Sequence, residues 1–346
     1  MPSEDPDAFL AWLDGVARSA SVDAVVPLDE DSVRLLAERG AEMNGLTVVG
    51  PSRDQYRALC DKLTLPHTAR SLDIDSPATI VVERDGPLDD WPPLPAIVKP
   101  ARSTASGLTA RIARTATERD DLVRRILDEG VTPLVQECVT GPRWVIHSVR
   151  GAGVFEHVTY RVGREWPRDA GLASVKTPEP TPPQLLTAAR RLLDHVDYRG
   201  PSGISFIERD GRHHVHDVNL RLGGTTGASL HAGFDFPRRA VETALGAGGR
   251  PFSGGWRPGT YMRLDLEAVA LRDALTTRRS GQTPGEVLRG IASVAVDPRG
   301  RLDPSPLDPL GVWPSVASWI WEAVRARTRP RSPDARARSL HEGRPT

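Results

Sequence analysis

The 346 residues of the chain exceed what one hydrophobic core usually supports, so about two or three packed subdomains are expected. Its 45 basic and 45 acidic side chains give a formal net charge of zero, which argues against nucleic acid or an anionic membrane as a partner. No apolar run approaches the roughly 20 residues of a membrane-spanning helix, and the acidic N-terminus is unlike a signal peptide, so we expect a cytoplasmic protein. The two cysteines, Cys60 and Cys138, are too few for a disulfide framework and are expected to be small buried residues.

Residues 1–60 follow the order helix, strand, helix, strand, helix, which is typical of an α/β layer with parallel strands. Such a layer normally opens on a strand, so we expect a partial domain, either reduced or cut short by a start codon assigned too late. In that case the strand edge near residues 22–28 is exposed and favours a homodimer or aggregation. The predicted helices cover residues 8–17, 32–39 and 54–63, and the predicted strands cover residues 23–28 and 46–49.

From residue 96 onward the pattern changes to strands joined by tight turns, which predicts an α+β region. A proline-rich stretch at 177–183 is expected to break the chain before an amphipathic helix, and Asp210-Gly211 is expected to turn a hairpin. The tail after residue 330 is too polar and basic to pack, so we expect disorder there. The predicted strands cover residues 96–99, 109–113, 134–137, 143–149, 154–161, 203–207 and 213–219, and the predicted helices cover 118–127, 184–196 and 236–245.

A first candidate for phosphate binding is Lys99, which ends a predicted strand. It is followed by a loop of small hydroxyl residues and glycine, including Ser103, Ser106 and Gly107. A cation beside closely spaced backbone N–H groups suits a polyphosphate. A turn without any binding function is the competing interpretation, because Ser/Gly loops are common.

A second candidate is the end of the strand at 134–137, where Gln136 and Glu137 precede a turn at Val139. The Glu137 side chain and the Val139 backbone can meet the hydrogen-bonding edge of a purine. The alternative is a strand end whose glutamate faces water.

A third candidate is the strand that carries Asp217, Asn219 and Arg221. Side chains two residues apart share one face of a strand, so Asp217 and Asn219 can both offer oxygen ligands to one Mg2+. A salt-bridged strand is the alternative. Nearby, His213, His214 and His216 suggest zinc, but strict alternation puts His213 on the Asp217 face and the other two histidines on the opposite face, so they should not converge.

In this order and spacing, the three segments resemble the ATP-grasp superfamily. The Lys99 strand and loop resemble its phosphate-binding lysine and flexible lid, and QECVTG at 136–141 resembles its adenine hinge. DVNLR at 217–221 resembles its motif in which an acid and an amide hold magnesium and an arginine holds the transferring phosphate. Asp61-Lys62 resembles the pair that opens the family's domain, with Lys62 reaching toward the nucleotide phosphates.

The resemblance implies an ATP-grasp fold, in which two α+β subdomains clasp ATP, preceded by the partial parallel α/β domain. It implies catalytic roles for Lys99 and Arg221 and magnesium ligation by Asp217 and Asn219, with Mn2+ as an alternative ion. The implied domains are residues 1–60, 61–132, 133–250, an extension at 251–330 and the tail at 331–346. The implied ATP ligands are Lys62, Lys99, Ser103, Ser106, Gly107, Gln136, Glu137 and Val139.

Within the superfamily, the chain is most similar to bacterial proteins described as carboxylate-amine ligases. Their hinge is followed by a hairpin and an arginine-rich strand, as at 159–167 here. The resemblance implies that Arg161, Arg164 and Lys176 face the substrate carboxylate or the acyl phosphate. A solvated basic edge is the equally weighted alternative.

Two positions depart from the family pattern. Many members carry an acid for the ribose hydroxyls seven residues after the hinge glutamate, where this chain has Trp144. The family's first metal ligand corresponds to Ser205, and a hydroxyl replaces a carboxylate poorly. Family geometry needs Ser205 opposite Asp217, which a three-residue loop with a bulge provides, whereas a two-residue turn sets Ser205 opposite His216.

The expected activity is therefore ATP-dependent coupling of a small carboxylate to an amine, or to a thiol, through an acyl phosphate. In this expectation the carboxylate attacks the γ-phosphate of Mg-ATP, and the amine then displaces phosphate behind a closed lid. The competing expectations are a nucleotide-binding protein without turnover and a kinase or carboxylase. The partners are small molecules, and neither acid nor amine can be named from the sequence.

Overall fold

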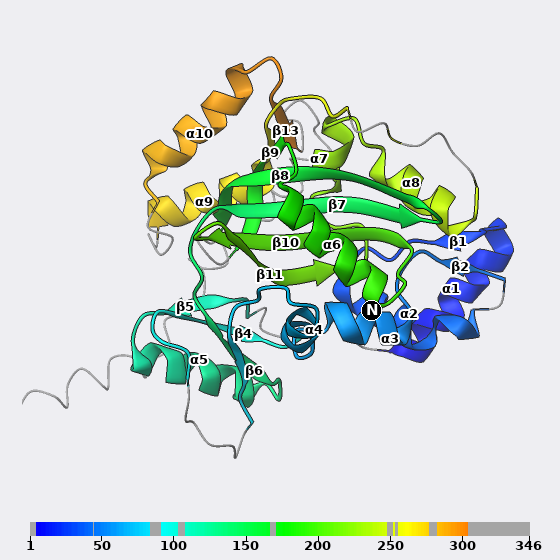
Figure 1. Cartoon of the computed structure of the whole chain (residues 1–346), viewed down its shortest axis with the longest axis horizontal. Helices are drawn as coiled ribbons and strands as arrows, with labels where there is room; N and C mark the ends of the chain where they lie inside the picture. The colour runs from blue at the N-terminus through cyan, green and yellow to red at the C-terminus, as the bar shows by residue number, and fades with distance from the viewer. Residues whose placement is uncertain are drawn as a thin grey trace, which may run out of the picture.

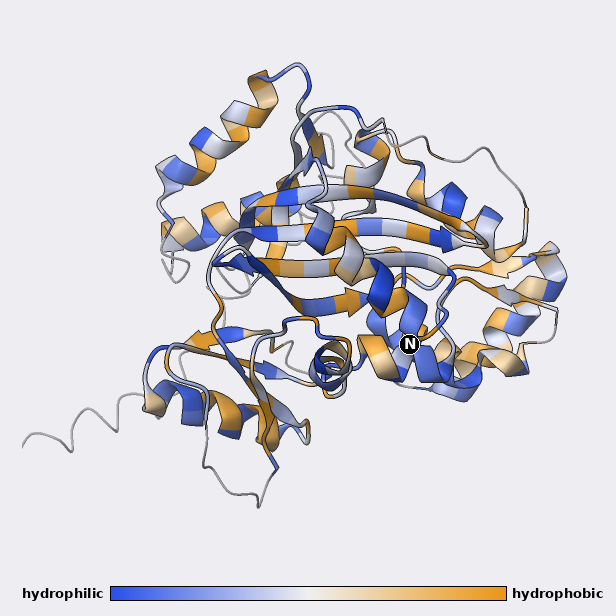
Figure 2. Cartoon of the chain, in the orientation of Figure 1, coloured by the Kyte–Doolittle hydropathy of each residue, from blue (hydrophilic) through white to orange (hydrophobic). Residues whose placement is uncertain are grey.

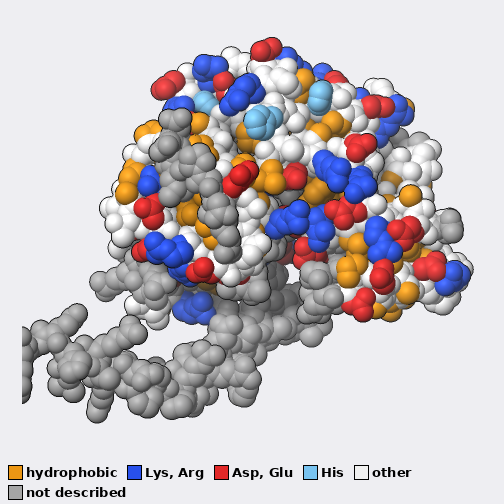
Figure 3. All heavy atoms as spheres, turned by 90° about the horizontal axis from the view of Figure 1, so that it is seen from below, with side chains coloured by type: hydrophobic (Ala, Val, Ile, Leu, Met, Phe, Trp, Pro, Cys, Tyr) orange, Lys and Arg blue, Asp and Glu red, His pale blue; other side chains and the backbone are white. Residues whose placement is uncertain are grey.

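The computed structural model describes residues 5–43, 45–83, 91–102, 108–166, 171–247, 252, 255–276 and 282–303. The expected lid residues Ser103, Ser106 and Gly107, and the tail after residue 330, lie outside these ranges. Within them, no helix combines the length and the apolar character needed to cross a membrane. Basic and acidic side chains are interspersed over the face seen in Figure 3.

The N-terminal unit confirms the predicted alternation of helices and strands. Helix α1 (Pro6–Ala20), strand β1 (Ala24–Val25), helix α2 (Glu30–Arg39), the 3-10 turn η1 (Gly40–Glu42) and strand β2 (Thr47–Val48) follow one another, and the two strands are parallel. The side chains of Asp5 and Asp29 cap the two helices by accepting backbone hydrogen bonds, as N-cap residues do. Leu10, Leu36 and Leu46 belong to the small core of this unit.

The helix predicted over 54–63 is shorter and differently wound. The capping box of Ser52 starts α3 (Arg53–Gln55), which continues as the π-helical turn η2 (Tyr56–Cys60). The Asp61 N–H donates to the carbonyl of Tyr56 at 3.1 Å, five residues back, and the helix ends there. Lys62 is therefore in a turn before α4 (Leu65–Ser71) rather than in a helix.

A small antiparallel sheet follows, in the order β3–β6–β4–β5. Its helix α5 begins at a capping box made by Thr115 and Glu118. Val98, Val123 and Val135 belong to the core between helix and sheet. The elements are β3 (Thr79–Val81), β4 (Ala96–Pro100), β5 (Arg111–Ala113), α5 (Ala116–Asp128) and β6 (Pro133–Glu137).

A larger sheet has the strand order β11–β10–β7–β8–β9–β12–β13 (Figure 1). The predicted break at 177–183 begins later, because residues up to Glu179 pair with β8. The strands are β7 (Arg143–Gly151), β8 (Val154–Trp166), β9 (Leu172–Glu179), β10 (Gly200–Arg209), β11 (Arg212–Asn219), β12 (Tyr261–Arg263) and β13 (Arg301–Asp303). The helices of this part are α6 (Pro183–His195), α7 (Thr226–His231), α8 (Phe236–Ala244), α9 (Leu264–Thr276) and α10 (Pro284–Val296).

Helices cover both faces of the large sheet. Helix α6 packs its apolar side, including Leu185, against Ile146 and Ile204, and turns largely hydrophilic residues outward (Figure 2). On the opposite face, α8 contributes Phe236 to a second core with Val149 of β7. We call these the α6 face and the α7–α8 face.

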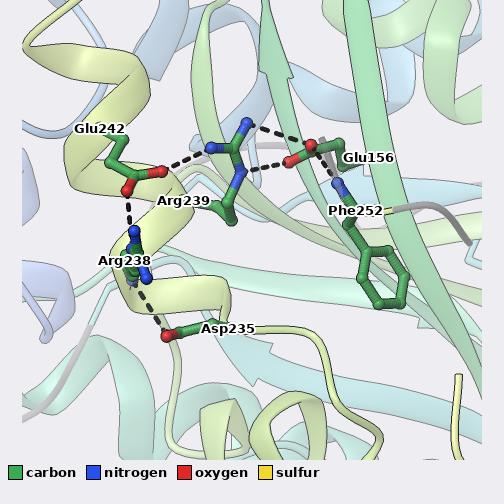
Figure 4. A network of polar contacts seen from close by, with 6 residues as sticks. All are labelled: Glu156, Asp235, Arg238, Arg239, Glu242 and Phe252. Carbon is green, nitrogen blue, oxygen red and sulfur yellow. Dashed lines mark hydrogen bonds and ion pairs between the residues drawn. The ribbon is translucent and has the colours of Figure 1, made fainter. Parts of the chain in front are cut away.

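An ion-pair network fixes α8 to the sheet (Figure 4). Glu156 of β8 is 4% exposed and accepts hydrogen bonds from Arg239 at 2.8 and 3.1 Å. It also accepts one from the backbone N–H of Phe252 at 2.6 Å, and Arg239 extends the network to Glu242. The buried carboxylate is thus paired and hydrogen-bonded, which is the condition for keeping it charged in a core.

The β10–β11 hairpin combines two features that were expected as alternatives. Its loop is the two-residue turn Asp210-Gly211, with φ of 54° and 74°. A bulge inside the strands, at His216, nevertheless places Ser205 opposite Asp217. The register that the family geometry requires is therefore present, and the extra residue lies in β11 rather than in the loop.

The same bulge corrects the expected direction of His213. Glu208 pairs with His213, and Phe206, two residues before Glu208, belongs to the core on the α6 face. His213 therefore lies on the α6 face, whereas Asp217 lies on the other, because the bulge reverses the alternation between them.

The two cysteines are free and half-buried, less enclosed than expected.

Candidate functional site

Three charged side chains from different parts of the chain approach one another at the edge of the large sheet. Lys99 lies one residue before the end of β4 and is half-buried, Lys62 lies in the turn after η2, and Asp217 lies on β11. Burial lowers the pKa of Lys99 to about 8, the charge of Asp217 opposes this shift, and the charge of Lys62 adds to it. The structure therefore brings together two expected phosphate ligands and an expected metal ligand.

Gln136 holds Lys99 in place. The ammonium of Lys99 donates to Oε1 of Gln136 at 3.1 Å, and Nε2 of Gln136 donates to Oγ1 of Thr79 at 2.8 Å. The amide therefore orients the lysine from the neighbouring strand, which differs from the direct nucleotide contact expected of Gln136.

The side chain of Glu137 is also engaged inside the protein. It accepts hydrogen bonds from the backbone N–H of Ala78 at 3.3 Å and from the guanidinium of Arg209. Burial raises the pKa of Glu137, but these hydrogen bonds outweigh it and bring the pKa below its ordinary value. The carboxylate therefore faces an arginine while its side chain stays 25% exposed, and its contact with a purine remains a prediction. The Val139 N–H donates to the Glu137 carbonyl at 3.1 Å.

A glycine closes the hinge against the β10–β11 hairpin. Gly141 has φ of 149°, and a Cβ on it would lie 1.9 Å from the carbonyl oxygen of Glu208. Beside this glycine is a cavity of about 390 Å³, lined in part by Arg143 and Glu165 and by Gln282 and Glu286 near the start of α10. Side chains of the C-terminal extension therefore reach the hinge region.

The oxygen donors of the expected magnesium site share one face of β11. Asn219 donates through Nδ2 to a carboxylate oxygen of Asp217, which leaves its own amide oxygen for another partner. Ser205 lies in the same cross-strand row as Asp217. A carboxylate and an amide oxygen suit Mg2+, which takes its remaining ligands from water and phosphate, so these residues fit the ion.

The N-terminal unit contributes to the same region. Glu30, at the start of α2, lies 3.7 Å from the ammonium of Lys62. Arg221 donates to the carbonyl of Leu28 at 3.1 Å. Glu30 carries no sequence signal of a functional role, because one acid at the start of a helix resembles an ordinary capping position.

The three expected substrate cations do not form one group. Arg161 pairs with Trp144 across β7 and β8, and its guanidinium lies 5.0 Å from the indole centroid, on the α6 face. Arg164 is ion-paired with Glu267 of α9, which is 0% exposed. Lys176 is buried on the α7–α8 face. A bulge at Gly163 breaks the regular spacing of this strand, which the sequence pattern could not reveal.

Trp144, at the expected ribose position, is also part of the core. It is 6% exposed, and its indole N–H donates to Glu208 at 2.9 Å. Its ring therefore stabilises the hairpin beside the hinge and does not line the Lys99 side of the sheet.

A buried polar cluster, which the sequence analysis missed apart from Lys176, lies under α7. Lys176 donates to Oγ1 of Thr225 at 2.8 Å and lies 3.4 Å from Nε2 of His147. The ring of His147 reaches Ser229 through Nδ1 at 2.7 Å, and Tyr160 donates to Ser229 at 3.2 Å. The available sequence signal was His147 itself, a polar residue between Val145 and Val149 on the alternating pattern of β7.

Comparison with known proteins places the chain by structure rather than by sequence. No protein-family model and no curated protein matches its sequence. An L-amino acid ligase from Bacillus licheniformis is similar in structure, with a TM-score of 0.58 and 16% identity, over 75% of this chain and 66% of that one. A biotin carboxylase complex from Campylobacter jejuni gives a TM-score of 0.57 and 14% identity, over 72% and 60% of the two chains.

A third similar structure is the biotin carboxylase domain of 2-oxoglutarate carboxylase from Hydrogenobacter thermophilus, in complex with MgADP, ADP and bicarbonate. Its TM-score is 0.56 at 18% identity, over 72% of this chain and 60% of that one. The chain thus spans about 60–66% of the length of these neighbours. At such identities the likeness establishes the fold.

Proposed function

Because the chain has the ATP-grasp fold of these neighbours, as the sequence motifs predicted, we propose that it is an ATP-dependent ligase. It phosphorylates a small carboxylate and couples the acyl phosphate to an amine, with a thiol as the other acceptor. The observation that carries the proposal is the approach of Lys62, Lys99 and Asp217 from separate segments to one edge of the large sheet. Such a mixed group of cations and a hard oxygen donor suits Mg-ATP.

The residues divide the work of phosphate transfer. Lys99, held by Gln136, and Lys62 offset the charge of the nucleotide phosphates, and Arg221 offsets charge on the transferring group. Asp217 and Asn219 would hold Mg2+, which when bound screens the phosphate charge and makes the γ-phosphoryl group more electrophilic. The cavity beside Gly141 is of a size suited to the adenosine end of the nucleotide.

No side chain is required as a covalent nucleophile, because the substrate carboxylate is itself the attacking group. The carboxylate oxygen forms a bond to the γ-phosphorus while the bond to the β-γ bridging oxygen breaks and ADP leaves. An amine then forms the new bond to the acyl carbon and phosphate leaves. The L-amino acid ligase among the structural neighbours supports this choice over a kinase, and the biotin carboxylases make carboxylation the nearest related reaction.

One observation favours a second candidate, a nucleotide-binding protein without turnover. Ser205 stands opposite Asp217 and supplies a hydroxyl where a carboxylate would complete the donor set. A site with fewer anionic ligands binds the metal more weakly.

The decisive experiment follows ADP release in the presence of ATP and Mg2+ with a panel of carboxylic acids, with and without amines. A ligase releases ADP with one acid and forms a coupled product when the amine is added. Asp217→Ala is the matched control, since it removes a metal ligand that carries no core packing. ATP binding by calorimetry without ADP release for any acid would overturn the ligase proposal and leave the nucleotide-binding one.

A further inference from the structure

The buried cluster formed by His147, Tyr160, Lys176, Thr225 and Ser229, which we call the Lys176 cluster, has no role in the transfer steps above. Lys176 is 2% exposed and His147 is 4% exposed. The hydrogen-bond partners of the lysine among the described residues are a hydroxyl and an imidazole, not a carboxylate. A buried ammonium without a counter-ion is costly, so the site favours the uncharged amine.

The surroundings make Lys176 the titrating member of the cluster. Burial lowers its pKa to about 7, and the charge of Arg263 adds to this shift. Burial, with the charge of Lys176, lowers the pKa of His147 well below its ordinary value, and burial raises the pKa of Tyr160. At neutral pH, Lys176 can therefore gain or lose a proton while its two ring neighbours stay uncharged.

The hydrogen bonds prepare the cluster to receive a proton. Ser229 accepts from Tyr160 and lies 2.7 Å from Nδ1 of His147, a contact in which either atom can be the donor. Nε2 of His147 lies 3.4 Å from Nζ of Lys176 and 3.3 Å from Oγ1 of Thr225. In the tautomer that leaves Nε2 unprotonated, a newly formed ammonium on Lys176 can donate to both His147 and Thr225.

The choice of lysine at this position is chemically specific. Only three of the 45 basic residues in the chain are lysines, and the other two are Lys62 and Lys99 of the phosphate group. Arginine cannot be deprotonated in proteins, whereas a buried lysine exchanges its proton readily. A cation needed for structure alone would not require lysine in a chain that otherwise uses arginine.

The Lys176 cluster adjoins the transfer site through one loop. A Cβ on Gly223 would lie 3.6 Å from the guanidinium of Arg221, and the Gly223 carbonyl accepts from the backbone and hydroxyl of Thr226. Thr225 lies within this loop and is half-buried, while the other four members of the cluster are buried. Thr225 is therefore the member through which the cluster can meet a substrate.

The register of the sheet leaves space on the same side. Asn219 of the metal site and His147 lie in one cross-strand row, with Gly203 between them. The glycine places no side chain in that gap, so the row from the metal site to the cluster is unobstructed at this position.

The second half-reaction of the proposed ligase needs a proton acceptor. Most amines are ammonium ions at neutral pH, and an ammonium has no lone pair with which to attack an acyl phosphate. We propose, on the basis of the proposed ligase function, that Thr225 and Lys176 form a relay that takes a proton from the ammonium of the amine substrate.

The proton balance of this step is complete. The ammonium gives one proton to Oγ1 of Thr225 as the hydroxyl proton moves to Nζ of Lys176, so a neutral amine and a lysine ammonium result. The amine lone pair then forms the C–N bond while the C–O bond to phosphate breaks. The second proton leaves the nitrogen with the phosphate, and Lys176 returns its proton to solvent through the half-buried Thr225 before the next turnover.

Direct binding of the substrate carboxylate by Lys176 is a weaker interpretation. That role needs a charged, accessible ammonium, whereas Lys176 is buried behind Thr225 and its surroundings favour the uncharged form. The relay requires both the position of Lys176 behind Thr225 and its uncharged form.

The test compares two acceptors for the same acyl phosphate. Hydroxylamine is uncharged at neutral pH and needs no proton acceptor, whereas amino acids react from their ammonium form. With the acid that promotes ADP release, Lys176→Met should lower amide formation from amino acids about a hundredfold, the size typical of lost acid–base catalysis, and retain hydroxamate formation within a few-fold. Thr225→Val should do the same, and Thr225→Ser should restore amide formation.

The outcomes separate the relay from the ligase function. Wild-type protein that forms neither ADP nor hydroxamate with any acid overturns the ligase proposal, and the relay with it. Wild-type ligase activity with an equal loss of amide and hydroxamate in Lys176→Met assigns a structural role to the lysine and overturns the relay, as does an unchanged amide rate. A selective loss of amide, recovered at a pH high enough to deprotonate the amine, supports it.

Discussion

Replacing Lys176 by methionine should change how the stability of the protein depends on pH. The pKa of Lys176 falls from 10.5 in an ordinary setting to about 7 in the folded protein. Between these two values the unfolded chain holds a proton on this lysine and the folded chain does not, so the free energy of unfolding rises with pH. Below the folded pKa both states are protonated, and the full cost of the buried ammonium is present.

The size of the effect follows from the pKa shift. One pH unit between the two pKa values corresponds to about 1.4 kcal/mol. Since the folded group is half-protonated at its own pKa, the gain accumulates to roughly 2 kcal/mol between pH 7 and pH 9. Methionine has a similar volume and no charge, so the variant lacks this gain.

Urea unfolding of both proteins at pH 7, 8 and 9 measures the effect. The wild-type protein should be the less stable of the two near pH 7. As the pH rises to 9, its free energy of unfolding should increase by about 2 kcal/mol relative to that of Lys176→Met. All other titrating groups are common to both proteins and cancel in the difference. Lys176→Arg keeps a permanent charge, so it should be destabilised without the same recovery. A stability difference between wild type and Lys176→Met that is independent of pH would refute the inference that burial perturbs this lysine.

Three further predictions concern the phosphate and metal residues and the hinge. Lys99→Met should weaken ATP binding in calorimetry without unfolding the protein. The ATP affinity of the wild-type protein should fall as the pH rises through about 8, because Lys99 loses its charge there, and the affinity of the variant should not change over this range. Asp217→Ala should abolish ADP release while keeping measurable ATP binding, whereas Ser205→Ala should change turnover little. Gly141→Ala should lower the stability by more than about 1 kcal/mol in urea unfolding, whereas Gly15→Ala, whose Cβ meets no atom, should not.

Local patterns in the sequence determined much of the architecture. The spacing of apolar residues predicted the N-terminal alternation, most strands of both sheets and α6, because a helix or strand with one buried face must repeat with its own period. The order of the Lys99, Gln136 and Asp217 segments predicted the ATP-grasp fold. The order of these segments predicts the fold because each segment lies at or near the end of a strand, and the fold places these strand ends close together. The elements that were not predicted are β3, α4, β9, α7, β12, α9, α10 and β13.

Tertiary structure decided where individual side chains point. The bulges at His216 and Gly163 each insert one residue into a strand, and a single insertion moves later side chains to the other face. For this reason His213 lies away from the face on which the metal residues stand, although simple alternation indicated otherwise. Arg161 precedes the bulge at Gly163 and lies on the α6 face through its regular pairing with Trp144. Bulges depend on how neighbouring strands pair, which the sequence of one strand does not specify.

Burial and charge pairing also depend on partners that are distant in the chain. Glu30 reaches Lys62, and Glu267 binds Arg164, only after separate units have packed together. Lys176 was selected from the sequence as one of three cations for a substrate carboxylate. Its enclosure by α7, which lowers its pKa, made it a candidate for proton transfer instead, because the protonation state of a lysine is set by the solvent that folding removes from it.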